Sequence, residues 1–265
     1  MRLSRLTKGV LGTMTMIVLA LIYLPLIVVF VNSFSTSTNL TWPPPGFTLE
    51  WWGRAFQSQG ALDALRTSVE IALASTAIAL ILGTLISLAL QRHRFFGRDA
   101  VSLLVILPIA LPGIVTGIAL NNFFRTILDV RLGIATIIVA HATFCIVTVF
   151  NNVIARLRRM GTSLEEASAD LGAGVWTTFR LVTFPQLRSA LFAGGLLAFA
   201  LSFDEIIVTT FTAGAGDKTL PLWILDNLFR PNQAPIVNVI AVVLVLVSII
   251  PIYVAQRVSA DTAAR

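Results

Sequence analysis

The sequence predicts an all-α membrane protein with six membrane-spanning helices, and three observations lead to this expectation. Only 12% of the 265 residues are charged, whereas a soluble domain carries about 25%. Hydrophobic residues make up 56% of the chain, and the mean hydropathy is +0.87. The apolar residues also gather into runs close to the ~20 residues that a helix needs to cross a bilayer. The chain therefore has too few charges for a surface in water, and lipid is its expected solvent.

Six apolar runs fill most of the chain, and we expect each run to form one spanning helix. The first run follows three basic residues, as a secretory signal would. Its apolar core is too long for a signal, and no clear small-residue cleavage site follows it. We therefore expect a single transmembrane domain over residues 1–265 with a retained first span. The six expected spans are residues 10–31, 71–90, 101–120, 134–154, 190–211 and 236–255.

Positive charges on the two sides of these spans predict the orientation of the chain. Thirteen of the 19 lysines and arginines lie on one side, and six lie on the other. Cytoplasmic loops carry the excess of Lys and Arg, so both termini are expected in the cytoplasm together with the long loop at residues 152–189. This distribution accounts for the net charge of +6 without a nucleic-acid partner.

The outer loop after the first span, residues 32–66, contains Trp42, Trp51 and Trp52 beside a run of three prolines at 43–45. Tryptophan commonly anchors a chain at the lipid headgroups, and this is the interpretation that we favour. A docking surface for a partner outside the membrane is the alternative.

The third span is interrupted by Pro108, Pro112, Gly113 and Gly117. Broken helices at membrane depth are tolerated where they are buried in protein or line a cavity. Gly113 and Gly117 also form a G-x-x-x-G pattern, which permits close packing of two helices. A kink that lines a gate and a packing site are therefore both open, with Pro108, Pro112 and Gly113 as the candidate gate residues.

Ionisable residues inside the spans are functional candidates, because each costs at least about 2.5–3.5 kcal/mol on insertion scales. Asp204 and Glu205 fall about two-thirds of the way along the fifth span. Adjacent residues of a helix point about 100° apart, so we expect at least one of them to face a wet cavity. Glu70 lies near the outer end of the second span and can reach water. His141 lies in the middle of the fourth span, where a hydrogen-bonded core histidine is favoured over a proton relay.

Two histidines and a single cysteine, Cys145, exclude a disulfide framework and make a structural zinc site improbable, so no metal site is expected. The stretch from Gly214 to Thr219 is similar to a phosphate-binding loop but lacks the adjacent Gly-Lys pair. The sequence therefore contains no ATP-binding motif and no catalytic residues.

The loop at residues 152–189 contains an unusually polar segment. Ser163 followed by Glu166 forms a capping-box pattern, which predicts a helix start. Gly172 and Gly174 then predict its end, because glycine readily takes left-handed backbone angles. A second short helix is expected over residues 175–181, stopped by Pro185. This pattern predicts two short helices joined by a bend, with an exposed face of small and apolar residues.

The same segment resembles the cytoplasmic signature of permease subunits of bacterial ABC importers. That signature reads E-A-A, three residues, G, nine residues, then I-x-L-P. Every spacing is kept here, and the departures are mild: serine for the second alanine, valine for isoleucine and phenylalanine for leucine. In that family the loop is a coupling helix held in a cleft of a separate ATPase subunit. The alternative is a capped interfacial helix without a partner. The resemblance implies ATPase-coupling roles for Glu166, Ala167, Ser168, Gly172 and Pro185.

Other regions resemble the spermidine/putrescine permeases of the same family, in particular the second of their two membrane subunits. They are residues 46–52 and the region from Ser202 to Pro221. The resemblance implies the type I importer permease fold in a bacterial inner membrane. It also implies a second permease in a heterodimer, ATPase subunits that bind ATP and Mg²⁺, and a periplasmic solute-binding protein. This chain would bind lipid around its spans and no cofactor.

The expected solute of such a permease is a polyamine, and Asp204, Glu205 and Phe203 are the candidate pathway residues. Acids compensate the charge of a cation in a cavity of low dielectric constant, and an aromatic ring adds cation–π contacts. The alternative is that both acids pair with a basic group of the second permease. A different class of transporter, driven by an ion gradient, would use Asp204, Glu205 or His141 for coupling. It would also predict inverted repeats, which the sequence does not show.

Overall fold

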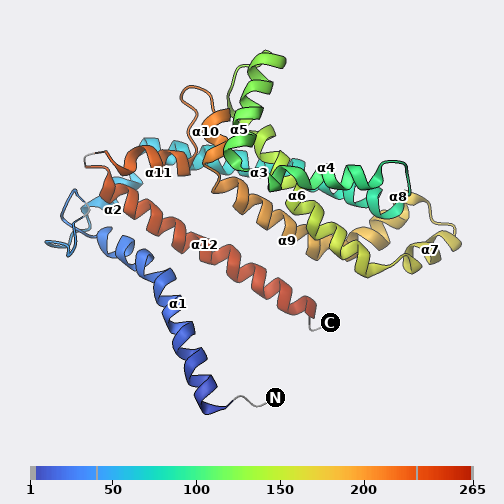
Figure 1. The fold of residues 1–265 in the computed structure, drawn as a ribbon, viewed down its shortest axis with the longest axis horizontal. Helices are drawn as coiled ribbons and strands as arrows, with labels where there is room; N and C mark the ends of the chain where they lie inside the picture. Colours follow the sequence, from blue (N-terminus) through green and yellow to red (C-terminus); the bar gives the residue numbers. More distant parts are fainter. Residues whose placement is uncertain (1–3, 40, 231, 264–265) are drawn as a thin grey trace. The chain divides into compact units, whose positions relative to one another are not determined.

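A computed structural model describes residues 4–39, 41–230 and 232–263 of the chain, with side chains described as far as residue 248 (Figure 1). These residues form helices and no strand, apart from one isolated bridge between Ser35 and Phe47. The all-α prediction is therefore confirmed. Four described helices are long and apolar enough to cross a membrane, and a bent helix pair would be a fifth. The sixth expected span, 236–255, lies in helix α12 (Ala234–Ala263), whose side chains are described only in part.

The chain divides into two compact units, and each is considered by itself. Residues 1–61 and 224–250 form the first unit. It contains α1 (Arg5–Asn32), α2 (Glu50–Phe56), part of α11 (Leu220–Leu228) and most of α12. Helix α1 begins where the Ser4 hydroxyl accepts a hydrogen bond from the Thr7 N–H at 3.1 Å. Most of its described side chains are exposed apolar groups, as expected for a helix in contact with lipid.

The outer loop of the first unit is folded around its tryptophans. The Trp51 Nε1–H donates to the carbonyl of Ser35 at 2.9 Å, and Trp51 is only 6% exposed. Trp52 stacks on Phe34 with ring centroids 5.3 Å apart. Trp42 remains exposed. Trp51 is therefore a core residue of the loop, a role that neither interpretation of the tryptophans included. Spacing along the chain does not reveal this contact, since Ser35 lies 16 residues from Trp51.

The second unit, residues 62–223 and 251–265, contains the remaining helices. Helices α6 (Ile134–Met160) and α9 (Phe184–Phe203) lie side by side (Figure 1). Small residues bring α3 (Gln59–Arg92) and α9 close to α6: a Cβ added at Gly83 would lie 3.0 Å from Val149, and one at Gly194 would lie 3.3 Å from Asn152. Van der Waals packing of this kind holds spanning helices together in lipid. The predicted second and fourth spans lie within α3 and α6, and both helices are long and apolar enough to cross a membrane.

The predicted third span, 101–120, is not one helix. It consists of α4 (Arg98–Ala110) and a helix that begins with α5 (Gly113–Asn122) and ends in the π-helical turn η1 (Phe123–Ile127), bent by 106°. The break lies at Leu111 and Pro112. Leu111 is extended, with φ −83° and ψ 143°, as the residue before a proline prefers. Pro108, by contrast, remains inside α4.

The two glycines after the bend pack against α10 (Ile207–Thr212). A Cβ on Gly117 would lie 2.7 Å from the ring of Phe211, and one on Gly113 would lie 3.6 Å from Ile207. The G-x-x-x-G pattern is therefore a helix-packing site. The gate role of Pro108, Pro112 and Gly113 stays a prediction.

The fifth span differs from the prediction at both ends. Residues 175–203 run through α8 (Val175–Thr178), the π-helical turn η2 (Phe179–Thr183) and α9 as one apolar stretch. Pro185 therefore does not stop a separate helix at 175–181. It lies in the first turn of α9, where its missing N–H is tolerated because the π turn already alters the hydrogen-bond ladder. At the other end the helix stops at Phe203, so residues 190–211 are not continuous.

Candidate functional site

The polar loop outside the spanning helices is shorter than residues 152–189, because α6 extends to Met160 and the next apolar stretch begins at Val175. Helix α7 (Ser163–Asp170) lies between them. Its N-cap is Thr162, whose carbonyl accepts the N–H groups of Glu165 and Glu166 at 3.0 Å each. No side chain caps this end, so the predicted capping box between Ser163 and Glu166 is wrong. Glu166 does not serve its own backbone, and its side chain is exposed.

The end of α7 follows the prediction for Gly172. This residue has φ +81°, in the left-handed region that favours glycine. Its N–H donates to the Ala169 carbonyl at 2.8 Å, and the Ala173 N–H donates to the Ser168 carbonyl at 3.1 Å. Together these bonds form a Schellman motif. Gly174 is different, because its φ is −72° and it lies at the start of α8.

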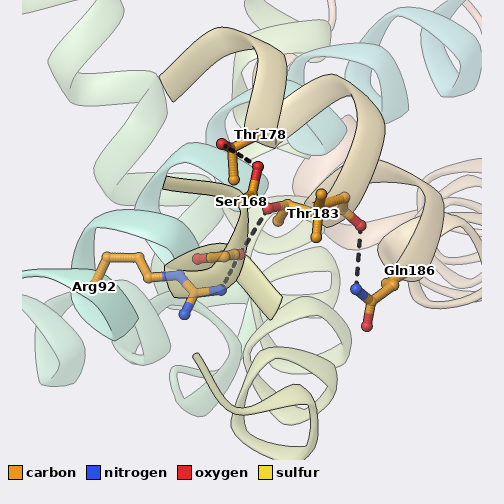
Figure 2. A network of polar contacts seen from close by, with 7 residues as sticks. Arg92, Ser168, Thr178, Thr183 and Gln186 are labelled. Atoms are coloured by element: carbon orange, nitrogen blue, oxygen red, sulfur yellow. Dashed lines mark hydrogen bonds and ion pairs between the residues drawn. The ribbon is translucent and has the colours of Figure 1, made fainter. Parts of the chain in front are cut away.

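Glu165, which precedes the signature, makes the contacts that hold α7 in place. Arg92 at the end of α3 forms an ion pair with it, and the Thr183 hydroxyl donates to the same carboxylate oxygen at 2.6 Å (Figure 2). Sequence reasoning missed this group because Arg92 and Glu165 are 73 residues apart. The available signal was a basic residue at the end of one span and a second acid beside the signature.

Further polar contacts connect the loop and the helices around it. The Ser168 and Thr178 hydroxyls lie 3.0 Å apart and join α7 to α8 (Figure 2). The Arg156 Nε–H donates to the carbonyl of Gln186 at 3.0 Å and joins α6 to the first turn of α9. Of the signature residues, Ser168 therefore has an internal partner.

One face of the loop is exposed and partly apolar. Four of the signature residues are exposed on it: Glu166, Ala167, Gly172 and Pro185. Within the described residues, the Glu166 carboxylate has no hydrogen-bond or ion-pair partner. The most exposed large apolar side chains here are Leu171 at 90% exposed, Val175 at 90%, Trp176 at 72% and Leu181 at 67%. Leu171 lies between the spanning stretches, and the other three lie near the start of the stretch 175–203. An exposed apolar patch at the end of spanning helices is typical of a docking site.

The two intramembrane acids lie in a break between α9 and α10, not on a continuous helix. The expectation that they point about 100° apart therefore does not apply. Glu205 accepts the Val208 N–H on Oε1 at 2.8 Å and so caps the start of α10. Asp204 ends α9, is exposed, and makes no ion pair or hydrogen bond through its carboxylate in the described part of the chain. Phe203 is half-buried and stacks on Phe199 with centroids 5.8 Å apart.

His141 is fully buried beside this break and joins its two sides. Its Nε2 lies 2.9 Å from the Thr209 hydroxyl on α10, and its Nδ1 lies 2.8 Å from the Ser202 hydroxyl on α9. The Thr209 hydroxyl already donates to the Glu205 carbonyl at 2.8 Å, so it accepts from His141 Nε2–H. Ser202 then completes the pair by donating to Nδ1 of a neutral ring, since an isolated buried charge is strongly disfavoured. The prediction of a hydrogen-bonded core histidine is confirmed.

The turn at Gly214 has a packing role. A Cβ at this position would lie 2.5 Å from the Leu132 carbonyl oxygen and 2.8 Å from the Asp217 carboxylate. Only glycine fits such a close approach of two backbone segments. The resemblance of this stretch to a phosphate-binding loop therefore has a structural explanation.

Comparisons with known proteins agree on one family. The family of the binding-protein-dependent transport system inner membrane component matches residues 76–263. The spermidine/putrescine transport system permease protein PotC of Escherichia coli K12 is 33% identical over 260 residues, covering 98% of this chain and 96% of that protein. The putrescine transport system permease protein PotI of the same organism is 32% identical over an alignment that covers 83% of this chain and 80% of that protein. The putative 2-aminoethylphosphonate transport system permease protein PhnV of Salmonella typhimurium is 30% identical and covers 87% and 86%.

Two solved structures share the fold. A bacterial ABC transporter that imports the acidic polysaccharide alginate superposes with a TM-score of 0.76 at 18% identity, covering 97% of this chain and 99% of that one. The MetNI methionine ABC transporter in an inward-facing conformation has a TM-score of 0.59 at 19% identity, covering 76% and 93%. The fold is therefore that of an ABC importer permease. This chain belongs to the family of inner-membrane permease components of binding-protein-dependent transport systems.

Proposed function

We propose that this chain is a permease subunit of an ATP-driven ABC importer for a polyamine, spermidine or putrescine. The observation that carries the proposal is similarity over nearly the whole chain to the spermidine/putrescine permease PotC. PhnV, at 30% identity, is named for a different solute, so the polyamine assignment also needs support from the residues of the pathway.

Asp204 supplies that support. It lies at the break of the fifth span with an exposed carboxylate that has no partner in the described residues. A polyamine carries several ammonium groups, and moving them through a low-dielectric cavity requires compensating negative charge. The ring of Phe203 beside it can add cation–π contacts of about 0.5–2 kcal/mol. Glu205 adds its charge to the same place, although one of its oxygens already caps α10.

The loop around α7 is the proposed docking site for an ATPase subunit. Glu166, Ala167 and Gly172 would lie at the contact, and the exposed apolar side chains near them would be covered by it. Ser168 and Pro185 would hold the shape of the loop through the link to Thr178 and the start of α9. ATP and Mg²⁺ would bind on the ATPase, and this chain would carry no cofactor.

The complete importer would contain a second, different permease, ATPase subunits and a periplasmic solute-binding protein. Both termini and the α7 loop would face the cytoplasm, as the distribution of Lys and Arg indicates. In this arrangement movement of the ATPase subunits would be passed to the spans through the α7 loop, and the solute would enter from its binding protein.

The test is uptake of radiolabelled spermidine by proteoliposomes that contain all subunits. Uptake with internal ATP and without an ion gradient is expected. Uptake that needs an ion gradient and ignores ATP would instead establish a secondary transporter.

Asp204→Asn tests the pathway in the same vesicles, with assembly and ATP hydrolysis measured in parallel. We expect spermidine uptake to fall while the assembled complex still hydrolyses ATP. Loss of assembly would show that Asp204 pairs with the second permease, and unchanged uptake would remove this residue from the pathway.

A further inference from the structure

One ion pair connects the α7 loop with the second span. Arg92 is the last residue of α3, and Glu165 is the third residue of α7. Their side chains form an ion pair in which Nη2 of Arg92 contacts Oε1 of Glu165. The Thr183 hydroxyl of η2 donates to that same oxygen at 2.6 Å. A single carboxylate therefore receives one contact from the second span and one from the base of the fifth (Figure 2).

This group is largely removed from solvent. The side chains of Arg92 and Glu165 are 16% and 21% exposed, and Thr183 is 3% exposed. Nη1 of Arg92 is buried without a hydrogen-bond partner. Glu165 is the only counter-ion of this guanidinium among the described residues. Breaking a buried pair by removing one partner is strongly destabilising, because the other charge is left uncompensated.

Apolar packing does not fill the space between α3 and the loop. A cavity of about 490 Å³ lies there, with Leu85, Leu88 and Ala89 of α3 on its wall. Arg92, Glu165 and Thr183 also line this cavity. Where side chains do not interdigitate they lose their dispersion contacts. The ion pair therefore spans a gap that apolar contacts leave open.

We propose that Arg92, Glu165 and Thr183 form a latch that fixes α7 to the second and fifth spans and transmits its movement to them. They are positioning residues, and the inference rests on the coupling role proposed for the loop. Glu165 faces inward to the protein's own spans, whereas Glu166, the first residue of the signature, is exposed. In this proposal Glu165 binds the protein's own spans, whereas Glu166 contacts the ATPase subunit.

The experiment uses the assembled importer with Arg92→Gln or Glu165→Gln. Two quantities are measured: amide hydrogen exchange of residues 163–170, and spermidine transported per ATP hydrolysed. Exchange should become faster in both variants. Transport per ATP should fall about tenfold, a loss that lies within the range of coupling energies between residues in direct contact. Arg94→Gln is the matched control, because Arg94 is an exposed arginine two positions on that has no partner in the described residues.

Two further variants separate the latch from a general loss of folding. Arg92→Glu combined with Glu165→Arg exchanges the charges, and the Thr183 hydroxyl can then accept instead of donate. This double variant should restore most of the transport per ATP. Thr183→Val should give an intermediate effect, and Thr183→Ser should behave as the natural protein because it keeps the hydroxyl.

An unchanged rate of amide hydrogen exchange in Arg92→Gln and Glu165→Gln would overturn the latch. It would also be overturned if the double variant with swapped charges transported no more spermidine per ATP than the single variants. Failure of the natural complex to transport spermidine would count against the proposed solute alone. The exchange measurement on residues 163–170 would still report on the latch in that case. Slower exchange in the single variants would also contradict it.

Discussion

Gly172→Val is the sharpest test of the α7 loop, because the structure isolates a single cause for its effect. A Cβ at this position would meet no atom within 4 Å, so the substitution causes no steric clash. The cost comes from the backbone, since φ is +81° and a β-branched residue strongly disfavours left-handed angles. Holding valine there costs about 1–3 kcal/mol. An eight-residue helix cannot absorb this cost by itself, because isolated helices of that length are marginal.

The expected result is a loop that leaves its Schellman geometry in most molecules. A cost of about 1 to 3 kcal/mol changes an equilibrium by a factor of roughly 5 to 150. Binding-protein-stimulated ATP hydrolysis and spermidine uptake should fall together in proteoliposomes, while the protein still inserts and assembles. Gly174→Val is the matched control: it lies in the same open loop, but its φ is −72°, which valine adopts freely.

Asparagine is the residue other than glycine that best tolerates left-handed angles, so Gly172→Asn should recover part of the activity. Normal stimulated hydrolysis and uptake in Gly172→Val would refute the reasoning. An equal loss in Gly174→Val would also refute it, because backbone angle would then not be the cause.

Three other predictions concern helix packing, a buried hydrogen-bond group and the orientation of the chain. Gly117→Ala should lower the melting temperature of the complex, since its Cβ would lie 2.7 Å from a neighbouring ring and overpacking costs about 1–3 kcal/mol, whereas Gly113→Ala should be tolerated at 3.6 Å. His141→Ala should cost about 2–4 kcal/mol in thermal denaturation, because it opens a cavity and leaves two buried hydroxyls without their partner. A cysteine introduced by Gly174→Cys should react with a membrane-impermeant thiol reagent only from the cytoplasmic side, and one introduced by Ala215→Cys only from outside. The reverse labelling would overturn the proposed orientation.

The sequence by itself determined the properties that depend on neighbouring residues. Helical spans follow from apolar runs, because lipid requires each segment to satisfy its own backbone hydrogen bonds. The position of α7 and its end at Gly172 likewise follow from local signals, as does the bend beside Pro112 in outline. Family membership was predictable for the same reason, since the loop signature is a matter of spacing along the chain.

Only the tertiary structure decided which side chains meet. Glu165 and Glu166 are adjacent acids, and only the second matches the loop signature. The fold pairs the first with Arg92 from 73 positions away and leaves the second exposed. Glu205 was read as a pathway acid, and the fold uses one of its oxygens to cap α10. Pro185 was expected to stop a helix, and it lies instead in the first turn of α9, directly after a π turn. These outcomes depend on hydrogen-bond partners and packing across helices, which are set by three-dimensional distance and not by spacing along the chain.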